Sequence, residues 1–411
     1  MKSIDELIAE FCPDGVEYKP LRELGDFYGG LTGKCKDDFG NGNAKFISYM
    51  NVYSNPATNL AVSDMARIGQ NEKQNQIQYG DVLFTGSSET PEECAMSSVV
   101  TTDITEPIYL NSFCFGFRLF DKSLYHPGFL KHLLRGEATR KQLHKTASGV
   151  TRFNVSKQRM ASVIIPRPCI EIQREIVRIL DGFTGLIDEL EAELAARRKQ
   201  YEQYRDRVLE SDIGTYKKVT VSDVCKNICS GGTPTAGNGK FYNGNIPWLR
   251  TQEVDWRDIV KTSLTITEEG LSNSSAKWIP ANCVIVAMYG ATAGKVAINR
   301  IPLTTNQACC NLEIDENVAE YKFVFYWLSY RYAQLKKLGQ GTQSNINAAI
   351  VKKFPINLPS LQEQKRIVET LDKFDALCND ETSGLAAEIA ARKTQYEYYR
   401  DKLLTFKRKA S

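Results

Sequence analysis

The segment IVRILDGF at residues 176–183 returns as IVETLDKF at residues 367–374, and YEQYRD at residues 201–206 returns as YEYYRD at residues 396–401. Both pairs keep the same order and lie in stretches with helical periodicity. A repeat of this length fixes a two-fold architecture more firmly than any single motif does. The chain is therefore predicted to alternate a globular segment, a long helix, a second globular segment and a second long helix.

Apolar residues in both long segments recur four and three residues apart, which is the a/d spacing of a coiled coil. Such a row must be buried against something long, and an antiparallel pairing of the two copies with pseudo-two-fold symmetry is expected. The alternative is an amphipathic helix that lies on its own domain. The predicted row, called the helix seam below, consists of Ile176, Leu180, Phe183, Leu190, Leu194, Tyr201 and Tyr204 in the first copy and of Ile367, Leu371, Phe374, Leu385, Ile389, Tyr396 and Tyr399 in the second.

The second copy is longer than the first by about four residues, at 379–382, and an insertion of four in a heptad pattern is a stutter. A stutter unwinds a supercoil locally without removing the seam. The adjacent Ser383 and Gly384 would instead break the helix. The sequence leaves both possibilities open.

The composition is that of an ordinary globular protein, with 42% hydrophobic and 25% charged residues, and 411 residues are enough for two cores. A net charge of +3 permits nucleic-acid binding but does not argue for it. No apolar run approaches the roughly 20 residues of a membrane span and the first residues do not resemble a signal peptide, so a cytoplasmic protein is expected. The 11 cysteines include no Cys-x-x-Cys pair, which favours reduced thiols over metal ligands or disulfides.

The two globular segments share one order of predicted elements, and that order indicates an α+β fold. In the first, short β-like runs fill residues 18–119, a helical piece follows at 127–143, and a strand at 162–166 closes the domain. The second segment repeats this order. The predicted boundaries are 1–170 for the first globular domain with a short helix at 3–11, 171–212 for the first long helix, 213–361 for the second globular domain and 362–411 for the second long helix.

Catalytic motifs are missing from the sequence. The glycine-rich stretch at 290–296 has one residue too few between its glycines for a phosphate-binding loop, and no Ser or Thr follows Lys295. Neither Gly-x-Ser-x-Gly nor His-Glu-x-x-His occurs, nor the Asn/Asp-Pro-Pro-Tyr/Phe motif typical of amino-methyltransferases. An enzymatic function is therefore not expected.

Several loops carry side chains suited to nucleic acid. SGGTPT at 230–235 leads to residues 244–252, and GGLTGKCK at 29–36 holds the equivalent place in the first half. Glycines let the backbone approach phosphates, and hydroxyl, amide and basic groups donate to phosphates or base edges. Each loop alone is more often a solvated turn, but their recurrence in both halves favours binding. The candidate DNA-contacting residues are Lys34, Lys36, Arg152, Asn154 and Lys157 in the first half and Gly231, Gly232, Thr233, Trp248, Arg250, Gln343, Ser344, Asn345 and Asn347 in the second.

Short segments spread along the chain are typical of one family. They are CPDGVE at 12–17, SGGTP at 230–234 with IPW at 246–248, and PSLQEQKRIV at 359–368, which is degraded to PCIEIQREIV at 168–177. With these segments the chain resembles, over essentially its whole length, the specificity subunit of a type I restriction–modification system. The first domain departs from the pattern because it lacks the Gly-Gly-Thr-Pro run.

The resemblance implies a noncatalytic DNA-recognition subunit in which each globular domain reads one half of a bipartite target. The helices would act as a spacer and, along the helix seam, as the docking surface for two methyltransferase subunits, which restriction subunits join. S-adenosylmethionine, ATP and magnesium would be used by those partners and not by this chain. Four added helical residues extend a helix by roughly 6 Å, close to two base pairs of DNA, so residues 379–382 are predicted to tune the spacer.

Other functions stay open at the level of sequence. A coiled-coil adaptor with protein-binding globular ends would not bind DNA. A self-sufficient enzyme is disfavoured by the missing motifs. A recognition subunit of a modification-only system would have the same sequence features, because nothing in this chain encodes the presence of a restriction subunit.

Overall fold

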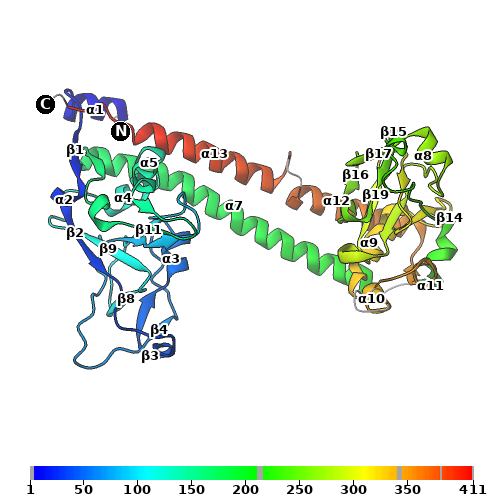
Figure 1. The fold of residues 1–411 in the computed structure, drawn as a ribbon, viewed down its shortest axis with the longest axis horizontal. Helices are drawn as coiled ribbons and strands as arrows, with labels where there is room; N and C mark the ends of the chain where they lie inside the picture. The colour runs from blue at the N-terminus through cyan, green and yellow to red at the C-terminus, as the bar shows by residue number, and fades with distance from the viewer. Residues whose placement is uncertain (1–3, 211–215, 340–344, 380–381, 410–411) are drawn as a thin grey trace. The chain divides into compact units, whose positions relative to one another are not determined.

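The chain folds into two compact units, residues 1–191 together with 388–411 and residues 192–387. Each unit contains a globular domain of strands and short helices with parts of the long helices packed on it (Figure 1). The predicted α+β class is confirmed. The computed structural model describes residues 4–210, 216–339, 345–379 and 382–409.

The first unit is built on an antiparallel sheet with strands in the spatial order β2 (Gly25–Gly29), β9 (Cys114–Leu119), β5 (Val82–Thr85) and β7 (Ser97–Val99). Every residue of β5 is buried, because this strand has neighbours on both edges and packed side chains on both faces. The short apolar run predicted at this place is thus a central strand.

Smaller sheets and short helices complete the first unit. In one of these sheets β3 (Phe39–Ile47) is parallel to β8 (Ile108–Leu110) and antiparallel to β4 (Met65–Ala66). The remaining strands are β1 (Glu17–Pro20) paired with β12 (Ile164–Arg167), and β11 (Phe153–Val155) between β10 (Ala147–Ser148) and β6 (Ser87–Ser88). The short helices are α1 (Ile4–Phe11), α2 (Leu21–Leu24), α3 (Tyr49–Ser54), α4 (Pro127–Leu133), α5 (Glu137–His144) and α6 (Lys157–Met160).

The core of the first unit joins the sheet, helix α4 and the start of the long helix α7 (Ile170–Glu210). Phe84 and Phe115 stack in this core with ring centroids 5.5 Å apart. Ile176 and Leu180 of α7 are completely buried in the same cluster. Each such side chain stabilises the unit by roughly 1.5–3 kcal/mol, so the start of the long helix is part of the domain.

The second unit has a five-stranded sheet in the order β14 (Cys225–Ser230), β21 (Cys309–Ile314), β18 (Val284–Ala287), β19 (Val296–Asn299) and β16 (Asp258–Ile259). Its other strands are β17 (Leu264–Ile266), β15 (Tyr242–Leu249) and β20 (Thr304–Thr305) in one sheet, and β13 (Lys217–Thr220) paired with β22 (Pro355–Leu358). Its short helices are α8 (Glu268–Ser272), α9 (Tyr321–Tyr330), α10 (Tyr332–Lys337) and α11 (Ala348–Lys353).

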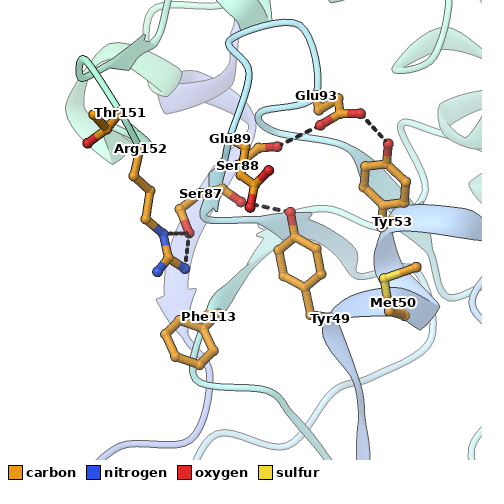
Figure 2. A pocket seen from close by; sticks show the side chains of 10 residues that line it. All are labelled: Tyr49, Met50, Tyr53, Ser87, Ser88, Glu89, Glu93, Phe113, Thr151 and Arg152. Atoms are coloured by element: carbon orange, nitrogen blue, oxygen red, sulfur yellow. Dashed lines mark hydrogen bonds between the residues drawn. The ribbon is translucent and has the colours of Figure 1, made fainter. Parts of the chain in front are cut away.

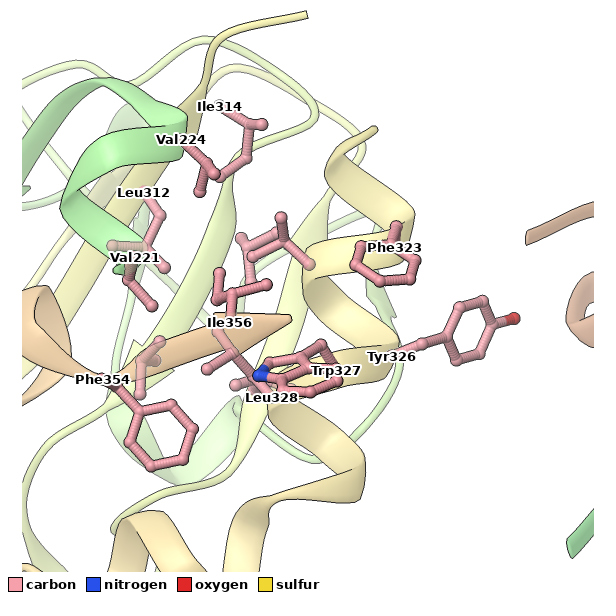
Figure 3. Packing of buried hydrophobic residues seen from close by; sticks show 14 of the residues in the cluster. Val221, Val224, Leu312, Ile314, Phe323, Tyr326, Trp327, Leu328, Phe354 and Ile356 are labelled. Atoms are coloured by element: carbon pink, nitrogen blue, oxygen red, sulfur yellow. The ribbon is translucent and has the colours of Figure 1, made fainter. Parts of the chain in front are cut away.

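Figure 3 shows how α9 covers the sheet of the second unit. Phe323 and Trp327 of this helix are turned towards Leu312 and Ile356 in the buried cluster. Tyr326 points the other way, and its hydroxyl donates to Asp372 Oδ1 at 2.8 Å. Asp372 belongs to helix α12 (Leu361–Asn379), so the outer face of α9 holds the start of the second helical repeat.

The strand orders of the two units correspond element by element. The order β2-β9-β5-β7 has its counterpart in β14-β21-β18-β19, and the parallel pair β3-β8 has its counterpart in β15-β20. The closing pair β1-β12 matches β13-β22 in the same way. The predicted repetition of one fold with little matching sequence is confirmed.

The first long helix is continuous as α7, but the second is not. Helix α12 ends at Asn379 and helix α13 (Leu385–Leu403) begins after a gap in the helical structure. Gly384 adopts a φ of +92°, and a Cβ atom added there would lie 2.6 Å from the carbonyl oxygen of Ala376. The expectation of one continuous second helix is therefore wrong, and the alternative of a break at Ser383 and Gly384 is confirmed.

In the first unit the helix seam pairs α7 with α13. The rings of Phe183 and Tyr399 stack with centroids 5.3 Å apart and an interplanar angle of 19°. Further along α7, Glu191 forms a 2.6 Å ion pair with Lys393. Because the contacts move backwards along α13 as they advance along α7, the two helices are antiparallel, as predicted.

In the second unit the seam pairs α12 with the last turns of α7. The Phe374 ring lies 6.0 Å from the Tyr201 ring and 6.1 Å from the Tyr204 ring. Ile367 and Leu371 are buried in the domain core, as Ile176 and Leu180 are in the first unit. The first turns of each helical repeat thus lie on their own domain, as the alternative interpretation predicted. Later turns pair with the other repeat, as the coiled-coil interpretation predicted.

The remaining seam residues are less buried. Leu190, Leu194, Leu385, Tyr396 and Tyr399 are partly exposed, whereas Ile389 is buried. The four-part domain division stays a prediction, because the compact units are divided within the helices rather than at their ends.

Among the described residues, no helix is both long and apolar enough to cross a membrane. All 11 cysteines are free thiols, and six of them are buried. Burial raises the pKa of the Cys310 thiol to about 12, which keeps this side chain protonated. In the part of the chain that the structure describes, His, Cys, Asp and Glu side chains form no group of three or more that would suit a metal ion.

Candidate nucleic-acid interface

The glycine loop of the first unit follows β2, and one of its glycines, Gly30, is closely packed. A Cβ atom added at Gly30 would lie 2.1 Å from the carbonyl oxygen of Asn111. The backbone of this loop therefore approaches a neighbouring loop of the same unit closely. The approach to phosphate expected of these glycines stays a prediction.

The two predicted lysines of this loop differ in their surroundings. Lys34 forms a 2.6 Å ion pair with Glu72, and its side chain is only 7% exposed. The hydrogen bond from Lys34 lowers the pKa of Glu72 to about 2, so Glu72 is charged at neutral pH and already serves as the partner of Lys34. Lys36 lies on the exposed turn η1 (Lys36–Asp38). Of the two, Lys36 is thus better placed to meet a phosphate.

Arg152, Asn154 and Lys157 come together with the glycine loop. Residues 29–32, Asn154 and Lys157 line one open pocket of about 370 Å³ beside Phe113 and Phe115. Lys157 Nζ lies 5.5 Å from the centroid of the Phe115 ring. The structure therefore gathers on one surface residues that are more than 120 positions apart in the chain.

Arg152 is held at the edge of this surface. Its Nε and Nη2 atoms donate to Ser87 Oγ at 3.3 and 3.0 Å, and its guanidinium lies 5.6 Å from the centroid of the Phe113 ring. These contacts fix the direction of the side chain while Arg152 stays exposed. A basic side chain held in this way is ready to contact a ligand with little loss of rotamer entropy.

Beside Arg152 lies a second open pocket, of about 500 Å³, which the sequence analysis did not predict (Figure 2). Tyr49 and Tyr53 of α3 line it with parallel rings whose centroids are 6.2 Å apart. Tyr53 donates to Glu93 Oε1 at 2.9 Å and Ser88 Oγ to Glu93 Oε2 at 3.0 Å. These hydrogen bonds, the one from Tyr53 first, lower the pKa of Glu93, so the pocket contains a carboxylate.

In the second unit the glycines of the Gly-Gly-Thr-Pro loop pack closely against neighbouring segments. Gly231 and Gly232 are buried, and added Cβ atoms would lie 2.0 Å from Thr305 O and 2.2 Å from Ala276 N. Trp248 is only 4% exposed, and its indole N–H donates to the carbonyl of Gly232 at 3.0 Å. These residues are therefore packed inside the unit, and their assignment as DNA contacts stays a prediction.

The exposed member of this loop is Thr233. Its hydroxyl donates to Gln307 Oε1. Gln307 comes from the loop before β21, so the two loops are joined at the surface. The packing of Trp248 and the two glycines thus fixes the backbone that carries Thr233.

Arg250 and Asn345 also lie near the surface of the second unit. Arg250 precedes the turn η4 (Thr251–Glu253), and its Nε atom is buried without a hydrogen-bond partner among the described residues. Asn345 Oδ1 accepts a hydrogen bond from the backbone N–H of Gly290 at 3.2 Å. Their role in DNA contact stays a prediction.

Asn347 has a local structural role. Its Oδ1 atom accepts from the backbone N–H of Ile350 at 2.9 Å and caps helix α11. In the first unit Ser156 caps α6 in the same way, through the N–H of Arg159. The counterpart of Asn347 is therefore a helix cap, and its side chain is already engaged. Gln343 and Ser344 lie outside the described residues.

A partly exposed aspartate joins each helical repeat to its domain. Asp181 Oδ1 lies 2.6 Å from Lys131 Nζ and 2.6 Å from His132 Nε2, and Asp372 occupies the corresponding place beside Lys322 and Tyr326. Burial alone would raise the pKa of Asp181, but hydrogen bonds from His132 and Lys131 outweigh it and lower the pKa to about 2. Both repeats are thus fixed at the same point by an aspartate side chain.

The profile of one protein family, described as the type I restriction modification DNA specificity domain, matches residues 13–197 and again residues 213–391. The two matches coincide with the repeated fold and extend into the long helices. They therefore cover most of the chain.

Curated relatives have the same description. The chain is 39% identical over 257 residues to the Type I restriction enzyme EcoR124I/EcoR124II specificity subunit of Escherichia coli, a match that covers 59% of this chain and 63% of the relative. It is 30% identical over 276 residues to a putative type I restriction enzyme specificity subunit of Haemophilus influenzae, which covers 63% of this chain and 68% of that protein. The matched part is thus less than two thirds of the length of the Escherichia coli relative.

Solved structures share the fold. A type I restriction–modification S subunit from M. genitalium aligns with a TM-score of 0.56 at 13% identity and covers 95% of this chain and 96% of its own. A chain from a structure that describes complex assembly and conformational transition of the type I R-M system gives a TM-score of 0.65 at 20% identity, over 95% and 97% of the two chains. At these identities the likeness concerns the fold.

Proposed function

Because the chain belongs to the family of type I restriction modification DNA specificity domains, we propose that it is the DNA sequence-recognition subunit of a type I restriction–modification complex. The observation that carries this proposal is the repetition of one strand order with polar loops at corresponding places in both units. Two sites of one kind with different side chains suit a bipartite target whose halves differ in sequence.

Each unit reads one half of the target. In the first unit the surface is formed by Arg152, Asn154 and Lys157 beside the exposed ring of Phe113 and the buried ring of Phe115. In the second unit the candidate contacts are Thr233, Arg250 and Asn345. Basic groups position the protein on phosphates, and sequence is read by groups that reach base edges. The two sets of side chains therefore predict two different half-sites.

The chain is noncatalytic in this proposal, and its partners carry out the chemistry. Two methyltransferase subunits dock on the helical repeats and restriction subunits join them. S-adenosylmethionine, ATP and magnesium bind those partners. The missing catalytic motifs of the sequence and the names of the relatives support this division. A cytoplasmic location is consistent with it.

The test is reconstitution of the chain with its methyltransferase partner. The complex is expected to retain double-stranded DNA at low salt and to methylate one bipartite sequence, whereas the chain alone methylates and cleaves nothing. Sequencing of methylated bases in a host that expresses both proteins gives the target.

Other outcomes would assign a different function. Failure to retain DNA in the presence of the methyltransferase would contradict the proposal in favour of a protein-binding adaptor. Methylation or cleavage by the chain alone would identify an enzyme. Methylation without ATP-dependent cleavage, when all proteins encoded beside this chain are present, would identify a modification-only system.

A further inference from the structure

The pocket beside Arg152 in the first unit has opposite charges on its two sides. Figure 2 shows Arg152 and Phe113 on one side and Tyr53 and Glu93 on the other, with Glu89 between them on the upper rim. The loops that form it come from α3, from the segment after β5 and from the segment before β11. The pocket adjoins the predicted DNA-contacting surface, because Ser87 and Phe113 line both.

Arg152 and Glu89 at the rim of the pocket keep hydrogen-bonding groups that no described residue occupies. Arg152 donates through Nε and Nη2 to Ser87 Oγ and forms no ion pair with a described carboxylate. A guanidinium has five N–H donors, so the Nη1 group stays available. Glu89 is exposed, and its carboxylate makes no hydrogen bond or ion pair with any residue that the structure describes. Donor and acceptor are therefore both free to meet a ligand.

Apolar side chains line the same pocket as these charges. Met50 is 60% exposed and Phe113 is 59% exposed, although both are large hydrophobic side chains. Neighbouring exposed apolar residues mark binding sites more often than single ones do. A ligand for this pocket needs flat or methyl-bearing apolar surface together with a hydrogen-bond acceptor and a donor at its edge.

We propose that this pocket reads a G·C base pair from the major groove, with Arg152 donating to guanine O6 and N7 and Glu89 accepting from the N4 amino group of cytosine. This inference rests on the proposed function. Arginine paired with guanine and a carboxylate paired with cytosine are the matches that the groove edges of these bases allow. Phe113 and Met50 lie beside the pair and exclude water from the two hydrogen bonds.

The two carboxylates at the rim of the pocket disfavour a phosphate ligand. Glu89 and Glu93 at one rim repel an anion, whereas an exocyclic amine is a neutral donor that a carboxylate accepts. Glu93 is a positioning residue, because Tyr53 and Ser88 already occupy its oxygens. It holds the loop that carries Glu89 against helix α3. The pocket therefore selects a base edge rather than the sugar–phosphate backbone.

The experiment compares variants of the chain in complex with its methyltransferase on a library of randomised duplexes. The wild-type complex is expected to enrich two half-sites, one of which contains a G·C pair. Glu89→Gln replaces an acceptor by a group that pairs with adenine. This variant is expected to lower the preference for the G·C pair about tenfold at one position and to leave the other half-site unchanged. Arg152→Gln is expected to relax the same position.

Matched controls separate base reading from general charge effects. Glu92→Gln removes the same charge from an exposed residue of the same loop that does not line the pocket. Arg159→Gln removes the same positive charge as Arg152→Gln, but from an exposed arginine outside the pocket. Both controls are expected to keep the enriched sequence.

Three results would overturn the proposal. They are an unchanged motif in Glu89→Gln, an equal loss of preference at all positions of both half-sites, and the same change in the Glu92→Gln control. A wild-type complex that enriches no sequence would instead contradict the proposed function. The two failures are therefore distinguishable. Thermal unfolding of each variant verifies that the fold is intact.

Discussion

The Oε1 atom of Gln173 accepts a 2.8 Å hydrogen bond from the backbone N–H of His126, the residue that precedes helix α4. Its Nε2 atom donates to the carbonyls of Leu124 and Pro168. Gln364 does the same in the second unit, with the N–H of Glu320 and the carbonyl of Pro359. Both glutamines are completely buried, so each one joins the start of a helical repeat to its domain.

Replacement of Gln364 by alanine is expected to lower the free energy of unfolding by about 2–3 kcal/mol, because a buried N–H and a buried carbonyl lose their partner. Denaturant unfolding measures this loss. Gln362→Ala, an exposed position two residues earlier on the same helix, is the control and is expected to change the free energy by less than about 0.5 kcal/mol. Equal effects of the two substitutions would contradict the role of Gln364.

Acid is expected to destabilise the first unit through His132. Burial lowers the pKa of His132 below its ordinary value of 6.5, although Asp181 opposes this shift. The unfolded chain therefore binds more protons than the folded one as the pH falls below 6.5, and stability is lost in that window. The low pKa of Asp181 adds a further loss below its ordinary value of 3.8.

Hydrogen exchange of α4 and α9, corrected for the intrinsic pH dependence, measures the two units separately. Protection of α4 is expected to fall as the pH drops below 6.5, and His132→Gln is expected to weaken that dependence. Helix α9 has Tyr326 at the corresponding place, and a tyrosine does not titrate in this range. An α4 protection that is equally pH-dependent with and without His132 would contradict the assignment.

Gly384 and Gly182 predict opposite effects of the same substitution. Gly384→Ala forces a β-carbon into a backbone with φ of +92° and within 2.6 Å of a carbonyl oxygen, which is expected to cost about 1–3 kcal/mol. Gly182 lies inside α7 with open space around it. Gly182→Ala is expected to stabilise the protein by about 0.5–1 kcal/mol. Thermal unfolding measures both, and a stabilising Gly384→Ala would contradict the break described here.

Substitutions at Trp248 and at Thr233 are expected to affect different properties, stability and recognition respectively. Trp248→Ala empties a buried site and is expected to lower the free energy of unfolding by about 3–5 kcal/mol. Thr233→Val changes an exposed hydroxyl and is expected to alter only the half-site read by the second unit. Denaturant unfolding and the methylated sequence measure the two effects. Loss of both half-sites in Thr233→Val would contradict the division of labour between the units.

Deletion of residues 379–382 is expected to change the number of base pairs between the two half-sites. These residues include the end of α12 and precede Gly384, so the deletion shortens the link between two helices. Mapping of methylated bases measures the spacer. An unchanged spacer with both half-sites intact would contradict a role of this segment in setting the distance.

The sequence predicted the helical repeats well because their signal is periodic and local. Ile176 and Leu180 stand at core positions of α7, and Ile367 and Leu371 repeat them in α12. The break was harder to predict, because four extra residues in the heptad pattern fit a stutter within one continuous helix as well as a break between two helices. Only the positive φ of Gly384 distinguishes the two.

The loops were predicted less well, because one residue type serves two physical purposes. Glycines at 231 and 232 are equally suited to approaching a phosphate and to packing against Thr305. Their burial, and that of Trp248, depends on partners elsewhere in the chain. The pocket beside Arg152 was missed because Tyr49, Glu89 and Phe113 come from one helix and two separate loops with no shared pattern.

The hydrogen bond from Trp248 to Gly232 divides one loop into two kinds of position. Substitutions at the two glycines or at Trp248 lower the free energy of unfolding, whereas substitutions at Thr233 leave the core unchanged. New target preferences are therefore accessible by single changes at the tip of the loop, without compensating mutations. The hydrogen bond between Trp248 and Gly232 thus confines tolerated variation in this loop to its exposed residue, Thr233.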